Sequence, residues 1–415
     1  MKEVVLKSFV VAAGMSSSLV NFRGPLIQRL LSAGYYVHAI APGLNDDQAT
    51  QAQLKAWGVI THDVPMQRTG TNPLRDLSTL RSLYRLFREI KPDAVMGYTI
   101  KPVFYGTLAA WVARVPKRYV LITGLGYAFS DQAQGKRAIV LYVVRRLYRL
   151  AIHRAHHVMF QNPDDQALFR SLGILPNHVP STVVNGSGVD MKHFEKAPLP
   201  DSPVSFLLTA RLIADKGVRL YAEAAKQIKS KHPDVTFFLV GDLDDNPESI
   251  RREELDAWIE SGSIEYLGRL NDVRPALANS HVFVLPTYYR EGVPRTILEA
   301  MAMGRPIITT DAPGCRETVV EGDNGYLVPV KSVEPLAAAM QRFIDQPELV
   351  AKMGQRSRAI ADEKYDVHKV NAVMLEAMGV VAPTVQSAQC ATDAILQCPA
   401  IVNGHNGNGR SGVKS

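Results

Sequence analysis

Two glutamates stand eight positions apart, with a proline between them, in the segment REGVPRTILEAMAMGRP at residues 290–306. Pro294 suits the first turn of a helix, because its ring fixes φ and its missing N–H is not needed there. Glu291 should therefore lie in the loop before that helix, and Glu299 about one and a half turns inside it. The unpaired N–H groups of a helix start suit a phosphate group. The spacing lets the two carboxylates hold opposite ends of one extended ligand.

Two cations stand in a second segment, TARLIADKGV, at residues 209–218. Arg211 comes at the end of a predicted strand, and Lys216 comes just before a predicted helix. Both side chains can then point toward the N-terminus of that helix, where an Arg fork beside a compact Lys charge suits a diphosphate. The alternative is that both are solvated surface cations.

A loop rich in glycine and serine follows the first predicted strand, in AAGMSSSLVNFRGPL. Gly14 and Ser16 offer backbone and hydroxyl donors ahead of a helix, which can approach a phosphate or a sugar closely. The pattern is not GxGxxG, so the dinucleotide-binding fingerprint is absent. A flexible turn with a solvated Arg23 is the alternative interpretation.

Short β-branched runs alternate with helical patterns along the chain. The strands and helices that these patterns predict must position the segments described above. The runs VVLKSFVVAA, YVHAIAP, DAVMGY and RYVLITG read as strands, and after KAPLPDSP the alternation restarts with VSFLLTA, VTFFLVG, SIEYLG, HVFVLP and RPIITT. Such alternation predicts βαβ units and parallel sheets. We therefore predict an α/β fold with two doubly wound, Rossmann-like domains, at residues 1–198 and 199–365. They should face a cleft, where the ligands of open sheets bind.

The composition argues against several classes of protein. The three cysteines, Cys315, Cys390 and Cys398, show no paired spacing, which argues against disulfides and a zinc site and favours a reducing compartment. Lys7 interrupts the apolar start of the chain, so we interpret that start as a strand rather than a signal peptide. No apolar run approaches the roughly 18 to 20 residues of a membrane span.

Positive charge is concentrated in the first half of the chain. Residues 1–198 carry 24 Lys or Arg against 12 Asp or Glu, whereas the remaining residues carry 23 against 28. Residues 137–154 contain no acidic residue and predict a basic helix that contacts an anionic membrane surface. Nucleic acid is not the expected partner, because base-reading motifs and interleaved aromatic residues are missing. A core-packed helix with a solvated face is the alternative. One helical face should carry Arg145, Arg146, Arg149 and His153, and another should carry Val140, Val143, Val144, Leu147 and Ala151.

The segment REGVPRTILEAMAMGRPIITTDAPGCRETV resembles the C-terminal signature of family 4 glycosyltransferases, retaining enzymes of the GT-B fold, including their E-x7-E motif. RLIADKG resembles the Arg/Lys diphosphate motif of that family. NFRGPLIQRLLSAGYYVHAIAP, YTIKPVFYGTLAA and TGLGYAF look like the branch that adds sugars to polyprenyl-diphosphate-linked glycans for bacterial surface polysaccharide or protein glycosylation. The resemblance spans residues 1–378. It implies that residues 366–382 form a helix crossing back to the first domain. The polar, glycine-rich tail at 383–415 is expected to be disordered.

The resemblance implies roles for individual residues. Arg211 and Lys216 would neutralise the donor diphosphate. Glu299 would accept hydrogen bonds from the ribose hydroxyls, and Glu291 would lie at the donor sugar. The residues expected to act in catalysis are Glu291, Arg211 and Lys216, and those expected to bind the nucleotide sugar are Glu299, Gly292, Val293, Arg295, Thr296, Gly14 and Ser16.

No metal ion is expected, because the cations and the helix start can stabilise the leaving diphosphate. Asp244 and Asp245 lie in the segment GDLDDNPES, which we interpret as a polar loop rather than as a metal site. Some family members carry a histidine after the fifth strand, whereas TGLGYAFSD has none, so no general base is assigned. Lys101 and Asp131 are weak candidates on the acceptor side, and a residue of either kind is more often a surface or structural residue.

The implied activity is the transfer of a hexose or N-acetylhexosamine, with retention of configuration, from a nucleotide sugar to a lipid-diphosphate-linked glycan. A UDP-sugar is the expected donor, and no further cofactor is expected. The enzyme should be cytoplasmic and peripheral on the inner face of the cytoplasmic membrane. A nucleotide-sugar epimerase or hydrolase of the same fold and a non-catalytic sugar-nucleotide sensor remain as alternatives, because fold alone cannot separate these classes.

Overall fold

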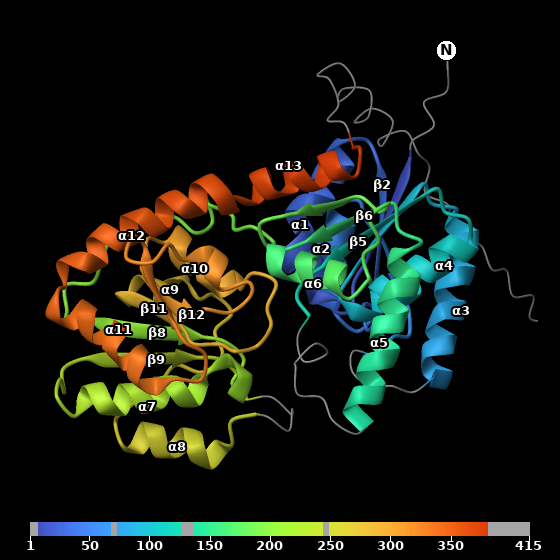
Figure 1. The fold of residues 1–415 in the computed structure, drawn as a ribbon. Coiled ribbons are helices and arrows are strands. Elements are labelled where there is room, and N and C mark those ends of the chain that lie inside the picture. The colour runs from blue at the N-terminus through green and yellow to red at the C-terminus, as the bar shows by residue number, and fades with distance from the viewer. Residues whose placement is uncertain (1–6, 68–72, 126–135, 244–248, 381–415) are drawn as a thin grey trace, which may run out of the picture.

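Two parallel β-sheets, each accompanied by helices, lie side by side in the computed structural model of the protein (Figure 1). The structure describes residues 7–67, 73–125, 136–243 and 249–380. The central strands, with the sequences AVMGY, SFLLT and VFVL, are mostly apolar and are buried along their length, as expected when helices cover both faces of a parallel sheet. The predicted α/β class with two doubly wound, Rossmann-like domains is confirmed.

The N-terminal sheet consists of β1 (Ser8–Ala12), β2 (Tyr36–Ala41), β3 (Ile60–Asp63), β4 (Ala94–Tyr98), β5 (Lys117–Ile122), β6 (His157–Phe160) and β7 (Ser181–Val183). Their order across the sheet is β3-β2-β1-β4-β5-β6-β7, and all neighbouring strands are parallel. The chain therefore reverses its direction of winding between β1 and β4. The carboxyl ends of these two strands form a topological switch point, the usual place for a ligand in such a sheet.

The helices of this domain are α1 (Ser17–Ser32), α2 (Gln48–Ala56), α3 (Pro73–Ile90), a π-helical turn η1 (Pro102–Gly106) that leads into α4 (Thr107–Val112), α5 (Lys136–Ile152) and α6 (Pro163–Ser171). The start of α6 follows directly from its sequence, NPDD. Asn162 is the N-cap, proline occupies the first helical position, and two aspartates favour the positive end of the helix dipole.

The C-terminal sheet consists of β8 (Ser205–Thr209), β9 (Thr236–Val240), β10 (Glu265–Tyr266), β11 (Val282–Leu285), β12 (Ile307–Thr310) and β13 (Gly325–Val328), in the order β10-β9-β8-β11-β12-β13. Its helical elements are η3 (Ala214–Lys216), α7 (Val218–Lys229), α8 (Arg252–Glu260), α9 (Arg274–Ala278), α10 (Arg295–Ala302), η4 (Arg316–Thr318), α11 (Val333–Asp345) and α12 (Glu348–Ile360). The switch point of this sheet lies between β8 and β11, so the loops after these two strands should hold the ligand.

The chain returns to the N-terminal domain through α13 (Val367–Ala377), which follows the turn η5 (Ala361–Tyr365) and lies over α1 in Figure 1. Met374 belongs to the apolar core around β1 and β4, and the Tyr119 hydroxyl donates to the Met378 carbonyl oxygen at 2.5 Å. The domain limits stated above stay a prediction. The tail predicted at 383–415 lies outside the described residues.

The burial of α5 differs in part from the prediction. Arg145, Arg146 and Arg149 are exposed, as predicted. Val140 and Val143, which were placed on the apolar face, are 39% and 48% exposed. Ala151 of the predicted apolar face is buried, and Val144 and Leu147 are partly buried against the same core. The fully buried stripe of α5 faces η1 and α4. It is formed by Leu141, Tyr148, Ala151 and Ile152.

Candidate active site

The side chains of Lys216 and Glu291 form an ion pair. Lys216 ends η3, the turn after β8, and Glu291 lies in the loop between β11 and α10. Both side chains are largely buried, at 13% and 14% exposure, and the Lys216 Nζ lies 5.5 Å from the centroid of the Tyr289 ring. Two of the three predicted catalytic residues, 75 positions apart in the sequence, thus meet at the switch point.

The loop that carries Lys216 is fastened to the loop after β11. Gly217 has a φ of +76°, and a Cβ there would lie 2.1 Å from the Pro286 carbonyl oxygen, so only glycine fits. The Thr287 hydroxyl donates to the Asp215 carbonyl oxygen at 3.0 Å. These contacts set where the Lys216 ammonium stands relative to Glu291.

Arg211, the third predicted catalytic residue, lies on the same loop as Lys216, two residues after β8. Its side chain is exposed, and its carbonyl oxygen accepts from the Ile213 N–H at 2.8 Å. Both predicted diphosphate-binding cations therefore stand at the carboxyl end of one strand.

Glu299 lies in the second turn of α10 and is 9% exposed. The Arg295 Nε donates to its Oε1 at 2.9 Å. Burial raises the pKa of Glu299, and the Arg295 guanidinium opposes that rise. Arg295 also reaches the other domain, because it donates to the Asn21 carbonyl oxygen and its Cζ lies 5.2 Å from the centroid of the Phe22 ring. Arg295 thus links the carboxylate expected at the nucleotide to α1.

The other predicted residues of this segment differ in what their side chains can reach. Val293 is 7% exposed and belongs to the apolar core under α10, so only its backbone can face a ligand. Thr296, in the first turn of α10, is half-buried. Pro294 is the N-cap of α10, with a ψ of 118°. The helix therefore begins at Arg295, one residue later than predicted, because Pro294 keeps an extended backbone.

Gly14 and Ser16 lie in the loop between β1 and α1. A Cβ on Gly14 would lie 2.5 Å from the Thr99 Oγ1, so this glycine lets the loops after β1 and β4 approach each other. The Thr99 Oγ1 is buried and makes no hydrogen bond within the part of the chain that the structure describes. The Ser16 hydroxyl donates to the Asp47 Oδ2 at 2.7 Å, next to the start of α2. The structure thus engages Ser16 within its own domain and leaves the backbone of this loop as the group that can meet a ligand.

Sequence reasoning missed the residues that join the two domains at Glu291. The Asn162 amide donates to the Glu291 and Gly292 carbonyl oxygens at 3.2 and 2.8 Å. The Arg290 Nε lies 3.0 Å from the Asp165 Oδ1. The NPDD pattern signals a helix start, but nothing in the sequence signals that the N-cap amide reaches the other domain.

The candidates for a general base gain no support. The Lys101 ammonium pairs with the Asp76 Oδ1 at 2.7 Å, and its side chain is 12% exposed, so Lys101 serves to connect η1 with α3. The other predicted polar residues, Asp131, Asp244 and Asp245, lie outside the described residues, as do Cys390 and Cys398.

Cys315 lies close to Glu291, but its thiol is not a nucleophile. Burial, and then the Glu291 carboxylate, raise the pKa of Cys315 to about 12, so its thiol stays protonated. Within the described ranges, no group of three or more His, Cys, Asp or Glu could hold a metal ion. Over the same ranges, no helix is both long and apolar enough to cross a membrane.

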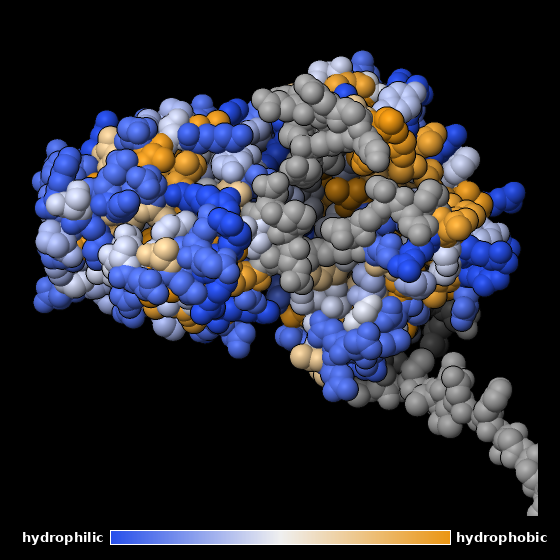
Figure 2. Space-filling model, turned by 90° about the horizontal axis from the view of Figure 1, so that it is seen from below, coloured by the Kyte–Doolittle hydropathy of each residue, from blue (hydrophilic) through white to orange (hydrophobic). Residues whose placement is uncertain are grey.

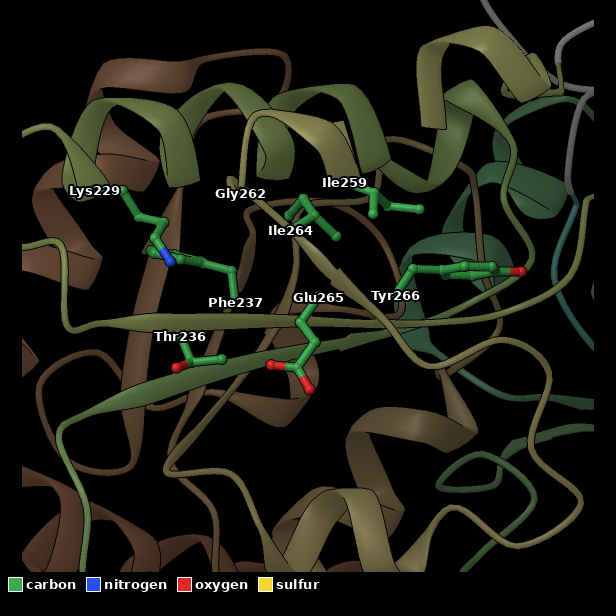
Figure 3. Close-up of a pocket in the computed structure, with 8 residues that line it drawn as sticks. All are labelled: Lys229, Thr236, Phe237, Ile259, Gly262, Ile264, Glu265 and Tyr266. Carbon is green, nitrogen blue, oxygen red and sulfur yellow. The ribbon is translucent and has the colours of Figure 1, made fainter. Parts of the chain in front are cut away.

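A hollow of about 390 Å³ opens elsewhere on the C-terminal domain (Figure 3). Lys229, Thr236, Ile259 and Glu265 line it, where the amino ends of β9 and β10 meet the last turns of α7 and α8. Ligands of open parallel sheets bind at the opposite, carboxyl ends of the strands. The hollow is therefore separate from the site around Glu291.

Comparison with known proteins agrees with this geometry. A family model described as Glycosyl transferase 4-like domain matches residues 23–186, and one described as Glycosyl transferases group 1 matches residues 203–346. The chain is 30% identical over 346 residues to the N,N'-diacetylbacillosaminyl-diphospho-undecaprenol alpha-1,3-N-acetylgalactosaminyltransferase of Campylobacter jejuni, over 80% of this chain and 88% of that relative. It is 29% identical to the UDP-Gal:alpha-D-GlcNAc-diphosphoundecaprenol alpha-1,3-galactosyltransferase of Escherichia coli, over 69% of this chain and 75% of that relative. The chain therefore belongs to the family 4 glycosyltransferases.

Solved structures show the same fold. A glycosyltransferase of Rickettsia africae matches with a TM-score of 0.72 at 18% identity, over 92% of this chain and 100% of that one. The Anabaena protein HepE in complex with UDP matches with a TM-score of 0.70 at 19% identity, over 91% of this chain and 100% of that one. The predicted GT-B fold and the predicted glycosyltransferase activity are confirmed.

Proposed function

We propose that this glycosyltransferase moves a hexose or N-acetylhexosamine from a UDP-sugar to a polyprenyl-diphosphate-linked glycan, with retention of configuration. The observation that carries the proposal is the meeting of Lys216 with Glu291 beside α10, which holds Glu299. A cation, a helix start and two carboxylates then stand at the switch point of the sheet, where a nucleotide diphosphate-sugar can bind. The names of the relatives, which specify undecaprenol-linked substrates, support the acceptor class.

The chemistry breaks the bond between the anomeric carbon and the diphosphate oxygen, so negative charge develops on the leaving diphosphate. Lys216 and Arg211 supply positive charge there, together with the N–H groups at the start of α10. These groups suffice for the leaving group, so we propose catalysis without a metal ion. Glu291 faces the donor sugar, and Glu299 holds the ribose. The acceptor hydroxyl gives its proton to the departing phosphate.

We propose that the N-terminal domain, residues 1–198, receives the acceptor, and that residues 199–365 bind the nucleotide sugar. The helix at 366–382 returns to the first domain and joins the two. Gly14 and the backbone of its loop, at the switch point of the first sheet, then face the diphosphate from the acceptor side.

We propose that residues 137–154 contact an anionic membrane surface, with α3 and α4 beside them. Arg145, Arg146 and Arg149 of α5 are exposed, and α5 has no acidic residue. Exposed apolar side chains accompany them, and Figure 2 shows hydrophobic residues gathered on the N-terminal domain in the view from below. Basic and apolar side chains together suit a bilayer interface. This basic-apolar surface comprises Leu77 of α3, Trp111 of α4, and Ile139, Tyr142, Arg145, Arg146, Arg149 and Leu150 of α5.

A membrane contact would keep the enzyme cytoplasmic and peripheral, on the inner face of the cytoplasmic membrane. The diphosphate of a polyprenyl-linked acceptor lies at that bilayer surface. Attachment through the acceptor-side domain therefore brings the catalytic loops to the acceptor.

The direct test is an incubation of the purified enzyme with a panel of UDP-hexoses and UDP-N-acetylhexosamines, with and without a polyprenyl-diphosphate-linked glycan. We expect a lengthened glycan only when both substrates are present, unchanged rates in EDTA, and an α-linkage by NMR when the donor is α-linked. Conversion of the UDP-sugar without acceptor would instead identify an epimerase or hydrolase. Binding of the nucleotide without turnover would identify a sensor.

A further inference from the structure

The side chain of Asn162 serves both domains at once. Its Oδ1 accepts from the Asp165 N–H at 2.8 Å and so caps α6 of the N-terminal domain. Its Nδ2 donates to the Glu291 and Gly292 carbonyl oxygens of the C-terminal domain. Asn162 is fully buried, so each of these groups would lack a partner if the amide were lost.

The peptide between Glu291 and Gly292 is packed from both domains. A Cβ on Gly124, in the loop after β5, would lie 2.5 Å from the Gly292 N. A Cβ on Gly314, in the loop after β12, would lie 2.2 Å from the Gly292 O. Such close approaches require glycine on both sides. The backbone that carries the Glu291 carboxylate is therefore held between the two domains.

An ion pair flanks this peptide. The Arg290 Nε lies 3.0 Å from the Asp165 Oδ1, and the Asp165 side chain is 1% exposed. The burial of an aspartate costs free energy unless the carboxylate is paired. The pairing with Arg290 therefore stabilises the contact between the two domains. α6 thus contributes both an amide and a carboxylate to the loop on the opposite domain.

We propose that Asn162 and Asp165 are positioning residues of the transfer reaction. They fix the Glu291 loop from the acceptor-side domain, so that the Glu291 carboxylate is correctly placed only when the two domains are in contact. This inference rests on the proposed role of Glu291 at the donor sugar. Neither residue touches the reacting atoms. Asn162 acts through the backbone of Glu291 and Gly292, and Asp165 acts through the side chain of Arg290.

The identity of the side chain at 162 follows from this double task. Serine and aspartate also cap helices well, but serine is too short to reach the other domain, and aspartate offers only acceptors to two carbonyl oxygens. Asn162→Ser and Asn162→Asp therefore keep the cap on α6 and remove the contact across the domains. Gln166→Ala is a matched control, because the Gln166 amide bonds Ser181 within the N-terminal domain at 2.9 Å.

The test measures the thermal midpoint, UDP affinity by calorimetry, kcat, donor KM and hydrogen exchange of residues 286–294 in the full-length enzyme. In both Asn162 variants we expect kcat to fall about tenfold or more and amides 290–293 to exchange faster. The thermal midpoint should fall, because the buried carbonyl oxygens lose their donor, and it should fall further in Asn162→Asp, whose carboxylate would lie beside that of Asp165. The UDP affinity and the exchange of the central strands should stay near those of the unsubstituted enzyme. Gln166→Ala should leave kcat and the 290–293 amides unchanged.

Unchanged kcat in a folded Asn162→Ser enzyme overturns the inference, as does a fall in kcat that Gln166→Ala reproduces. A loss of kcat without faster exchange at 290–293 also overturns it, because the effect would then not pass through the loop. If the unsubstituted enzyme transfers no sugar, the proposed function fails. Hydrogen exchange still decides whether Asn162 holds the loop.

Discussion

The ammonium of Lys216 and the carboxylate of Glu291 pair directly, although one follows β8 and the other follows β11. Both side chains are largely buried, so water solvates neither charge well. Each charge is therefore stabilised by the other. A diphosphate that enters between α10 and η3 offers Lys216 a second anionic partner. In the mechanism that we propose, Lys216 is already held where the leaving group needs positive charge, which would reduce the reorganisation required during transfer.

Lys216→Ala and Arg211→Ala should both weaken catalysis, because each leaves the departing diphosphate with less positive charge. The loss of one such contact should cost about 2 to 4 kcal/mol of transition-state stabilisation. Steady-state kinetics with saturating acceptor measures this as kcat/KM for the donor. Lys226→Ala, at an exposed position of α7, is the control and should behave as the unsubstituted enzyme. Full turnover in both site variants would remove the diphosphate assignment.

The two carboxylates of the E-x7-E motif should separate kinetically. Glu299→Ala should chiefly raise the donor KM, because contacts with the ribose exist in the ground state and the transition state alike. Glu291→Gln should chiefly lower kcat, because Glu291 lies at the reacting sugar in our proposal. Initial rates over a donor series give both constants. If both variants change kcat and KM in the same proportion, this division of roles is wrong.

The fold could be predicted from the sequence because the central strands are short, β-branched and separated by clear helical patterns. β1, β2 and β4 fall within predicted runs, and β5 begins one residue before its predicted run. β6, β7 and β13 were not predicted, and neither was β3. Its sequence, ITHD, is polar, and no residue of it is fully buried, since β3 is the edge strand of its sheet. An edge strand that mainly hydrogen-bonds to the backbone of the neighbouring strand needs no apolar pattern of its own, so the local sequence does not reveal it.

The sequence predicts which loops carry the site residues. It does not predict the contacts that those residues make outside their own loops. The segments carrying Lys216, Glu291 and Glu299 stand out because charge and glycine follow predicted strands. The contacts of Asn162 and Arg295 with the opposite domain could not be predicted, because they depend on how the two domains approach each other. Local periodicity contains no information on that approach.

A pair of histidines should make stability depend on pH. The His38 Nδ1 lies 2.9 Å from the His62 Nε2, across β2 and β3. Burial, and then His62, lower the pKa of His38 to about 4, and burial lowers that of His62 while Glu89 opposes the change. The pKa of a histidine in the unfolded chain is about 6.5, so the unfolded state binds more protons than the folded state. This contribution to stability is therefore present above about pH 6.5 and is lost as the pH falls toward 4.

The variant His38→Phe tests that dependence. We expect the unsubstituted protein to lose about 1 to 2 kcal/mol relative to the variant between pH 7 and pH 4.5, an amount that allows for solvent screening at a half-buried pair. Urea titrations at several pH values measure the difference in unfolding free energy, which cancels the carboxylates common to both proteins. A difference that stays constant with pH would contradict the assignment to this histidine pair.

The basic-apolar surface should bind anionic vesicles through two separable parts. Replacement of Arg145, Arg146 and Arg149 by glutamine removes the charge, which is worth about 1 kcal/mol for each cation near the surface and is screened by salt. Replacement of Ile139, Tyr142 and Leu150 by serine removes the apolar part, which salt does not screen. All six side chains are exposed, so folding stability should change little.

Co-sedimentation with vesicles across a salt series separates the two parts. The arginine variant should lose the salt-dependent binding and keep a weak, salt-independent remainder, whereas the serine variant should bind only at low salt. Both should transfer sugar poorly to a polyprenyl-linked acceptor and normally to a short, water-soluble analogue, because the catalytic loops are untouched. Glutamine at the exposed Lys226, Lys231 and Lys352 of the C-terminal domain is the matched control for charge and should bind as the unsubstituted enzyme does. Equal binding to neutral and anionic vesicles, or undiminished binding in both surface variants, would refute a membrane role for this surface and leave α5 as a helix that packs on one side and is solvated on the other.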